Sequence, residues 1–409
     1  MEASGWRVAP AGGSFRAFWS SHSMTPIGRF FWVVVLLALG ISGCTSASPP
    51  ADSNLPLTQA VATALASILG TQAASMPKPT TTPVATATVA RTPPALPAPY
   101  VSSHLNPLDT PHTYVQDTCQ YLKDKWTPGN SAAGTIVMVV MFHGIEKGEA
   151  TVTDPKNVGS SEFKQIMNGL HDMGFQAIDT EQLADFLDHN AAIPPRSVLL
   201  TQDDRHAAPN FNDWFRPYWE QWHWPVVNGW INALGGADPV LAENVALEQE
   251  GWVDHQAHGV IHNIPMSDGS TDEFLTGELQ GSITNMQAYF RKTPIAIIWP
   301  GGGFGVRPVQ FARKFGYRLG FTINPRGPVM YNWVPLADQQ DPRRPLYIPE
   351  GPVNDPRMVL PRYWPDQVLS NLDAVRVMGE EAAAFAAQNK ATEMAYYDIA
   401  CPPSLGPIP

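Results

Sequence analysis

The chain contains one stretch in which a hydrophobic strand ends in two acidic residues, Ser197-Val198-Leu199-Leu200-Thr201-Gln202-Asp203-Asp204. Its Val and Leu side chains follow one another without polar alternation, which is typical of a strand covered on both faces in a parallel α/β sheet. In such sheets the loops at the carboxyl ends of the strands carry the chemistry. Two adjacent carboxylates repel each other unless a cation or a proton compensates. The alternative is a helix cap or a turn, since Asp also favours those positions.

Strand and helix patterns alternate along the rest of the chain. Apolar strands are expected at 136–142, 176–178, 225–227, 252–253, 295–299, 319–323 and 358–360, and helices at 163–173, 181–190 and 241–251. Strands that alternate with helices over this length predict a parallel sheet, either open or closed into a barrel. The sequence shows no internal repeat.

Composition limits the classes of function. The chain has 409 residues, of which 44% are hydrophobic, and this is enough for a large core. A formal net charge of -11 without a basic cluster argues against a nucleic-acid partner. The three cysteines, Cys44, Cys119 and Cys401, form no CxxC pair, which excludes a thiolate zinc site. Cys119 and Cys401 bracket the folded part and are expected either to form a disulfide or to remain free.

The first hundred residues do not look like a folded domain. Arg29, an apolar run at 30–39 and small residues up to Cys44 are typical of an export signal rather than of a membrane-spanning helix. Ile41-Ser42-Gly43-Cys44 resembles a bacterial lipobox, whose cysteine is lipidated; an uncleaved anchor is the alternative. We therefore expect a lipoprotein signal peptide at 1–44, a disordered Pro/Thr/Ala-rich linker at 45–104 and a catalytic domain at 105–409, tethered to a bacterial membrane outside the cytoplasm.

Polar side chains follow three of the predicted strands. They are His143, the pair Asp203-Asp204, and the segment from His255 through His258 to His262. Carboxylates and neutral imidazoles are good ligands for zinc and similar divalent ions, and three protein ligands leave an open position for water. If one Asp binds the ion, the second is left to take a proton from water. The alternative is that the histidines are structural or merely exposed.

Five motifs in order resemble those of the polysaccharide deacetylases, the NodB-homology carbohydrate esterases. The resemblance covers about residues 134–362 and implies a distorted (β/α)7 barrel. The motifs are the strand Met141-Phe142-His143-Gly144-Ile145, the pair Asp203-Asp204 with its leading strand, His258-Gly259-Val260-Ile261-His262, Trp299-Pro300-Gly301, and Lys314-Phe315-Gly316-Tyr317 before the next strand.

The resemblance implies a role for each matching residue. Asp203 would be the general base, and Asp204, His258 and His262 would hold a divalent metal ion, zinc first, with nickel, cobalt or iron as alternatives. The implied reaction is hydrolysis of N-acetyl groups on a cell-surface or extracellular polysaccharide.

The motifs indicate a proton donor other than the one used by many relatives. No histidine follows His262, so the late histidine of many relatives is missing. The poly-N-acetylglucosamine deacetylase branch, which is closest in motif pattern, uses the early histidine, here His143; a structural role at the strand end is the alternative. Arg362 is expected to orient Asp203.

Several residues depart from the family pattern. Gln202 replaces an aromatic residue, Arg205 replaces a glycine, and the motif that begins Trp299-Pro300-Gly301 has glycine in place of an aromatic residue. The residues expected to bind substrate are Trp299, Pro300, Gly301 and Arg205. One alternative is therefore a catalytically impaired homologue that binds glycan. Another is a solute-binding lipoprotein, although its two-lobed pattern is not evident. One or two of a group of tryptophans are expected to line a glycan cleft, namely Trp214, Trp219, Trp222, Trp224 and Trp230. The oligomeric state is not predicted.

Overall fold

The computed structural model describes residues 91–409, apart from 149–151, 153, 155, 234–237 and 263. Its main sheet is parallel, and six of its strands follow the order β10-β9-β8-β7-β6-β2. These strands are β2 (Ile136–Phe142), β6 (Arg196–Asp203), β7 (Val226–Trp230), β8 (Val253–Ala257), β9 (Ala296–Ile298) and β10 (Leu319–Phe321). The short strand β5 (Gln176–Ala177) pairs with the first part of β6.

The segment that contains Leu360 and Tyr363 closes this sheet into a barrel. Leu360 forms a parallel bridge with Phe321 of β10, and Tyr363 forms one with Val140 of β2. The Tyr363 N–H donates to the Val139 carbonyl at 2.8 Å. Since this segment pairs with both end strands, it takes the seventh position, and the predicted distorted (β/α)7 barrel is confirmed. The expected strand at 358–360 is instead the 3-10 helix η3 (Pro356–Met358) followed by these bridges.

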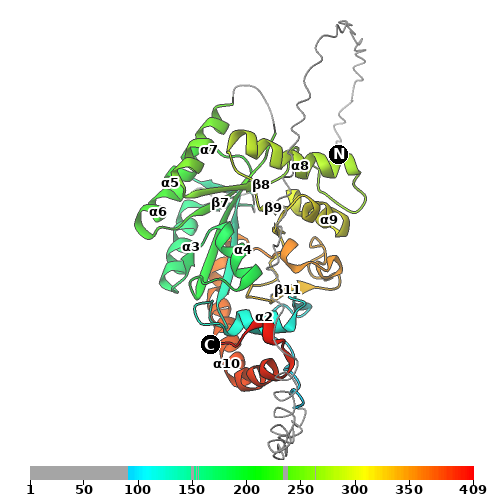
Figure 1. The fold of residues 1–409 in the computed structure, drawn as a ribbon. Coiled ribbons are helices and arrows are strands. Elements are labelled where there is room, and N and C mark those ends of the chain that lie inside the picture. The colour runs from blue at the N-terminus through cyan, green and yellow to red at the C-terminus, as the bar shows by residue number, and fades with distance from the viewer. Residues whose placement is uncertain (1–90, 149–151, 153, 155, 234–237, 263) are drawn as a thin grey trace, which may run out of the picture. The chain divides into compact units, whose positions relative to one another are not determined.

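Helices surround the barrel, as Figure 1 shows. The predicted helices correspond to α3 (Ser160–Asp172), α4 (Thr180–His189) and α7 (Pro239–Glu250). The longest described helix, α10 (Pro365–Ala400), packs against β2, α3 and α2 (Thr118–Trp126). The remaining helices are α5 (Ala208–Trp214), α6 (Arg216–Trp222), α8 (Asp272–Tyr289), α9 (Val306–Lys314) and the 3-10 turns η1 (Pro300–Gly302), η2 (Gly351–Val353) and η4 (Pro403–Leu405). Among the described residues, no helix is long and apolar enough to cross a membrane.

Strand β6 is an inner strand of the sheet, paired with β2 on one edge and with β5 and β7 on the other. Every residue of β6 after Arg196 is buried, and its apolar side chains belong to the core on both faces of the sheet. The strand therefore delivers Asp203, its last residue, to the carboxyl end of the barrel. Two small sheets lie outside, β1 (Asp109–His112) with β11 (Val334–Ala337), and β3 (Gly144–Glu146) with β4 (Asn157–Gly159).

The two ends of the folded region are tied together. Cys119 on α2 and Cys401 after α10 form a disulfide. Residues 91–104, which we assigned to the linker, include Tyr100, which stacks on Trp333 and whose hydroxyl donates to Glu381 at 2.6 Å. This part of the expected linker therefore packs on the domain. The expected signal peptide, its Cys44 and the linker up to residue 90 lie outside the described residues.

Candidate active site

The carboxyl end of the barrel brings the predicted catalytic and metal-binding residues together. Asp203 ends β6 and Asp204 follows it, His143 follows β2, and His258 follows β8. Arg362 comes from the closing segment between Leu360 and Tyr363. Because all of the barrel strands are parallel, residues that follow different strands meet at one edge of the barrel.

Asp203 is a buried carboxylate held by one arginine. Its side chain is 1% exposed, and Arg362 binds it through two parallel contacts, Nη1 to Oδ1 at 2.6 Å and Nη2 to Oδ2 at 2.9 Å. The Arg362 Nε also donates to the Thr322 carbonyl at 2.7 Å, which fixes the guanidinium. Burial alone would raise the pKa of Asp203, but the charge of Arg362 outweighs it and holds this pKa below its ordinary value. Asp203 is therefore ionised at neutral pH.

Asp204 faces two histidines instead of an arginine. Its Oδ1 lies 3.7 Å from His258 Nε2 and 3.2 Å from His262 Nε2, and the three ligand atoms lie within 4.8 Å of one another. Ligands at about 2.1 Å from a tetrahedral zinc ion lie about 3.4 Å apart, so this spacing fits such an ion. Asp204 has φ 74° and His262 has φ 67°, both in the left-handed region. Residues held in this region are concentrated at functional sites.

The backbone prepares His258 for a metal. Its Nδ1 donates to the Ile298 carbonyl at 2.8 Å, so Nε2 carries the lone pair and points toward Asp204. Metal-binding histidines are oriented by such a second hydrogen bond. The donor set, the spacing and the tautomer all fit a divalent ion.

A buried glutamate that the motifs did not reveal supports the loop between the two histidines. Glu278 of α8 is 1% exposed and accepts the backbone N–H of Val260 at 2.8 Å and that of Ile261 at 3.0 Å. Gly259 has φ 74°, and a Cβ there would lie 2.6 Å from Glu278 Oε2. The glycine of this motif is needed both for its conformation and for the approach of Glu278. The sequence feature that could have revealed Glu278 is its position as the single acidic residue on the buried face of α8.

His143 lies beside Asp203. Its Nε2 is 3.7 Å from Asp203 Oδ2, and its ring stacks on Trp364 with centroids 5.5 Å apart and planes 7° apart. Burial lowers the pKa of His143, and the nearby Asp203 opposes this only in part. Stacking on Trp364 therefore fixes the His143 imidazole beside the Asp203 carboxylate. Trp364 is a second residue of the site, after Glu278, that the sequence pattern did not predict.

The two flanking departures from the family pattern lie away from the Asp204–His258–His262 cluster. Gln202 is fully buried, and its amide donates to the His143 carbonyl. The guanidinium of Arg205 lies over the Trp230 ring, 4.7 Å from its centroid, and forms an ion pair with Asp238. The charge of Arg205 is thus balanced by a carboxylate outside the Asp203-Asp204 pair.

The motif at 299–301 does not form the substrate surface that we predicted. Trp299 is 0% exposed, and its indole N–H donates to the Met358 carbonyl at 2.7 Å, so its side chain belongs to the core. Pro300 is also buried, and of the three residues Gly301 alone is exposed. A residue at a strand end points either into the barrel interior or toward the loops, and the sequence pattern did not distinguish these directions.

Other residues of the predicted constellation lie elsewhere. His255 is buried inside β8 and contacts Glu248 at 2.8 Å and Asn244 at 2.9 Å, away from the Asp204 cluster. The five tryptophans after Asp204 belong to the core or pack against it, apart from the contact of Trp230 with Arg205.

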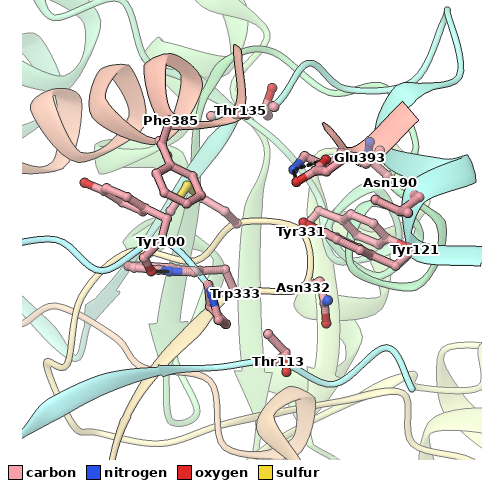
Figure 2. A pocket seen from close by; sticks show the side chains of 18 of the residues that line it. Tyr100, Thr113, Tyr121, Thr135, Asn190, Tyr331, Asn332, Trp333, Phe385 and Glu393 are labelled. Carbon is pink, nitrogen blue, oxygen red and sulfur yellow. Dashed lines mark hydrogen bonds and ion pairs between the residues drawn. The ribbon is translucent and has the colours of Figure 1, made fainter. Parts of the chain in front are cut away.

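A cavity at the opposite end of the barrel contains none of the predicted site residues. It has a volume of about 160 Å³ and adjoins Thr135, just before β2. Aromatic rings form much of its wall, and the Glu393 carboxylate on this wall is already paired with Lys125 at 2.8 Å (Figure 2). We therefore place the chemistry at the carboxyl end of the barrel.

Comparison with known proteins is consistent with this arrangement. No family model matches the chain. Over 188 residues the chain is 22% identical to the putative polysaccharide deacetylase YxkH of Bacillus subtilis, a match covering 46% of this chain and 64% of that protein. The chain thus spans less than two thirds of the length of this relative.

Two solved structures illustrate the similarity of fold. The Streptococcus pyogenes deacetylase PplD, in complex with acetate, is 21% identical, with a TM-score of 0.45 over 59% of this chain and 98% of that chain. IcaB from Ammonifex degensii is 14% identical, with a TM-score of 0.44 over 60% of this chain and 98% of that chain.

His143, Asp203-Asp204 and His258–His262 thus meet at one end of the barrel, in a chain whose sequence is similar to that of a putative polysaccharide deacetylase.

Proposed function

We propose that this protein hydrolyses N-acetyl groups of a polysaccharide with the help of a divalent metal ion. One observation carries the proposal: two adjacent carboxylates have different partners. Asp203 is bound by Arg362, whereas Asp204 faces His258 and His262. Such a division fits one carboxylate that handles a proton and one that binds an ion.

In this proposal Asp204, His258 and His262 hold the ion. The ion supplies Lewis acidity toward water and toward the acetamide carbonyl oxygen. Asp203 accepts the proton of the attacking water. Because Arg362 binds both carboxylate oxygens, Asp203 keeps one orientation and stays ionised. The same contact lowers the pKa of Asp203, which makes it a weak base.

His143 is the residue that we propose as the proton donor to the departing amine. It lies beside Asp203 and is 16% exposed, so it borders the space in which the acetamide would react. The parallel contact with Trp364 fixes the plane of its ring, and the Gln202 amide holds its backbone carbonyl. An acid whose position is fixed in advance needs little reorganisation during the reaction.

The surroundings of Gln202 and Arg205 support an active enzyme over a non-catalytic homologue that binds glycan. Gln202 supports His143, and Arg205 is paired with Asp238. Neither departure adds an uncompensated charge beside Asp204. Both are therefore compatible with binding of a cation.

We also propose that the protein acts outside the cytoplasm, as a bacterial lipoprotein anchored through a lipidated Cys44. The basic, apolar and small residues before Cys44 support this location. The disulfide between Cys119 and Cys401 also supports it, because disulfides persist in oxidising compartments. The substrate would then be a cell-surface or extracellular N-acetylated glycan.

A substrate panel tests the proposed reaction. We expect zinc-loaded protein to release acetate from at least one N-acetylated polymer among poly-N-acetylglucosamine, chitin oligomers and peptidoglycan. The Asp203→Asn variant should lose this activity while it still binds zinc, because its side chain keeps its size and lacks a basic carboxylate. If metal-loaded protein releases acetate from none of these amino-sugar polymers, the proposal that the protein is a deacetylase is wrong.

A further inference from the structure

A cavity of about 440 Å³ lies next to the segment that closes the barrel and has no assigned role. Its walls come from residues 104–106, 325–327 and 343–347, from Tyr363, and from Gln367, Asn371 and Met378 of α10. Small-molecule sites commonly have volumes of about 300–1,000 Å³, so the cavity is large enough for a sugar ring. The groups that matter here are the amides of Gln367 and Asn371, the phenol of Tyr347 and the guanidinium of Arg343.

The cavity adjoins the segment that carries Trp364. Tyr363, the residue before Trp364, lines the cavity. The Trp364 ring in turn stacks on His143 with centroids 5.5 Å apart. Gln367 of the cavity accepts the Trp364 backbone N–H at 3.2 Å. A single tryptophan therefore separates His143 from Gln367, a residue that lines the cavity.

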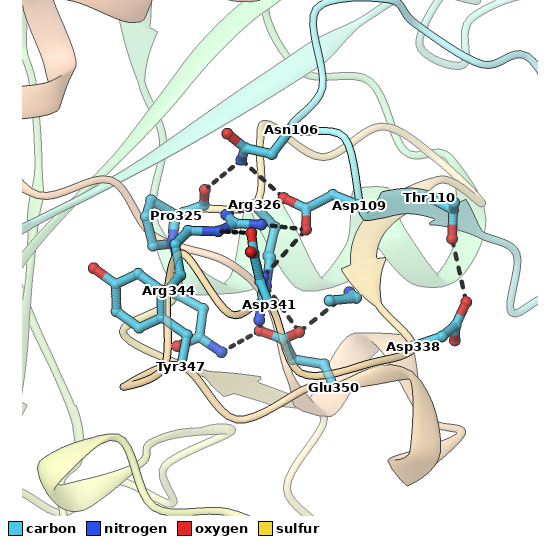
Figure 3. A network of polar contacts seen from close by, with 12 residues as sticks. Asn106, Asp109, Thr110, Pro325, Arg326, Asp338, Asp341, Arg344, Tyr347 and Glu350 are labelled. Carbon is cyan, nitrogen blue, oxygen red and sulfur yellow. Dashed lines mark hydrogen bonds and ion pairs between the residues drawn. The ribbon is translucent and has the colours of Figure 1, made fainter.

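A buried network of ion pairs fixes the wall that carries Tyr347. Arg326 is 0% exposed and binds Glu350 at 2.9 Å and Asp109 at 3.1 Å, and Arg344 binds Asp109 at 2.8 Å and Asp341 at 2.9 Å. Figure 3 shows the two arginines between these carboxylates. The nearby Leu346 is 86% exposed, so its packing does not hold this segment. Buried ion pairs add little net stability, and their geometry here holds the segment in one place.

Three arginines line the cavity, and carboxylates outside its lining balance their charges, which favours an uncharged ligand. Arg326, Arg343 and Arg344 are matched by Asp109, Asp341 and Glu350, three positive charges against three negative ones. The cluster therefore has no net charge with which to attract an anion. Amide, phenol and guanidinium groups can donate to hydroxyl and acetamide oxygens, and an aromatic ring can cover the apolar face of a pyranose.

We propose that this cavity is a subsite for an uncharged sugar residue of the polysaccharide, farther along the polymer than the residue that is deacetylated and its immediate neighbour. The inference rests on the proposed function and adds that the protein recognises more than one sugar. Tyr347 covers the sugar ring, and Gln367, Asn371 and Arg343 bind its polar groups. Activity should then depend on the length of the substrate, since a short oligomer does not extend past Trp364 into the cavity.

A variant that fills the cavity tests this subsite, and α10 offers a matched control. Asn371 is half-buried and its side chain donates to the carbonyl four residues earlier, Gln367, at 2.7 Å. Asn389 is also half-buried and makes the same contact with Phe385 at 2.8 Å, but it does not line the cavity. Asn371→Trp and Asn389→Trp therefore make the same change on one helix. Tyr347→Ala removes a wall of the cavity without adding bulk.

The readouts are acetate release from N-acetylglucosamine oligomers of two to six sugars and calorimetric binding of the hexamer to metal-free protein. We expect Asn371→Trp and Tyr347→Ala to lower kcat/KM for the hexamer, and its affinity, by about tenfold, equivalent to about 1.4 kcal/mol. The shortest oligomer accepted should react as with the unmodified protein. Asn389→Trp should change nothing.

Two results separate this inference from the proposed function. If Asn371→Trp, Tyr347→Ala and Asn389→Trp all keep the length dependence and hexamer affinity of the unmodified protein, the subsite is refuted while the deacetylase stands. If the unmodified, metal-loaded protein releases no acetate from any oligomer, the proposed function fails. A loss of hexamer affinity in Asn371→Trp would in that case still support a sugar site in the cavity.

Discussion

Two clusters of charged side chains in this domain have opposite arrangements. In the network around Arg326, three arginines meet three carboxylates, and the charges cancel within the protein. At the end of the barrel, Arg362 cancels the charge of Asp203, but Asp204 faces only imidazoles among the contacts that define its cluster. The first cluster is complete in itself, whereas the second leaves one negative charge for a cation.

The difference indicates what each cluster does. A neutral, buried set of ion pairs can hold a segment in place, and it offers nothing to an incoming ion. A carboxylate beside two oriented imidazoles is a ligand set for a divalent metal. The two clusters should therefore respond in different ways to the loss of a single side chain.

The largest expected effect follows removal of Asp204. Asp204→Ala should abolish zinc binding and reduce acetate release to background, because one of three ligands is lost. Asp341→Ala in the other cluster is the control and should bind zinc as the unmodified protein does. Calorimetric titration with zinc and an acetate assay measure both. Unchanged zinc affinity in Asp204→Ala would show that the ligand assignment is wrong.

Removal of Arg326 should act on stability instead. Arg326→Ala leaves Glu350 buried without its arginine and removes one of the two arginines that bind Asp109, which should lower the free energy of unfolding by about 3–5 kcal/mol. Zinc affinity of the molecules that remain folded should not change. Urea unfolding followed by tryptophan fluorescence gives the first quantity and calorimetry the second. A loss of zinc affinity with little loss of stability would contradict the separation of the two clusters.

His143 should control the rate of the reaction and its pH dependence. His143→Gln should lower kcat by about 100-fold or more, a common effect of removing a general acid. Burial lowers the pKa of His143 below its usual 6.5, so its protonated form increases only as the pH falls below that value. The kcat of the unmodified protein should thus rise toward mildly acidic pH, in a range where Asp203 remains ionised. The variant should lack this dependence, and full activity in His143→Gln would exclude the residue as the acid.

Glu278 should have the smallest of these effects. Glu278→Gln keeps the size of the side chain but weakens its contacts with Val260 N and Ile261 N, which position His262. We expect zinc affinity to fall by about 10-fold to 100-fold, as for other residues that orient metal ligands. Glu273→Gln, at an exposed position of the same helix, is the control. Equal zinc affinity in the two variants would remove Glu278 from the site.

Much of the barrel can be predicted from the sequence, for a physical reason. Strands that are covered on both faces have runs of apolar residues, as in β2 and β6. The polar residue that follows such a run lies at the carboxyl end of the strand, where the loops begin. The Asp203-Asp204 pair and His143 could be located in this way. Asp204, His258 and His262 could be grouped because two histidines and a carboxylate form a common ligand set.

Features that depend on tertiary contacts were not predicted. From the sequence we assign no element to residues 365–400, which form α10, because the second half of its buried face consists of Ala382, Ala386, Glu393 and Tyr397 and has no strong apolar stripe. Trp364 reaches His143 only because the closing segment pairs with β2. Trp299 was predicted at the substrate and is instead buried under the Met358 carbonyl.

The central claim is that Asp204, His258 and His262 hold a metal ion on which deacetylation depends. The most direct test is acetate release from poly-N-acetylglucosamine oligomers by protein stripped with a chelator and then titrated with zinc. We predict that the stripped protein is inactive and that activity returns in proportion to bound zinc, up to one ion per chain. Full acetate release by the metal-free protein, or one bound zinc ion per chain with no acetate released, would contradict the claim.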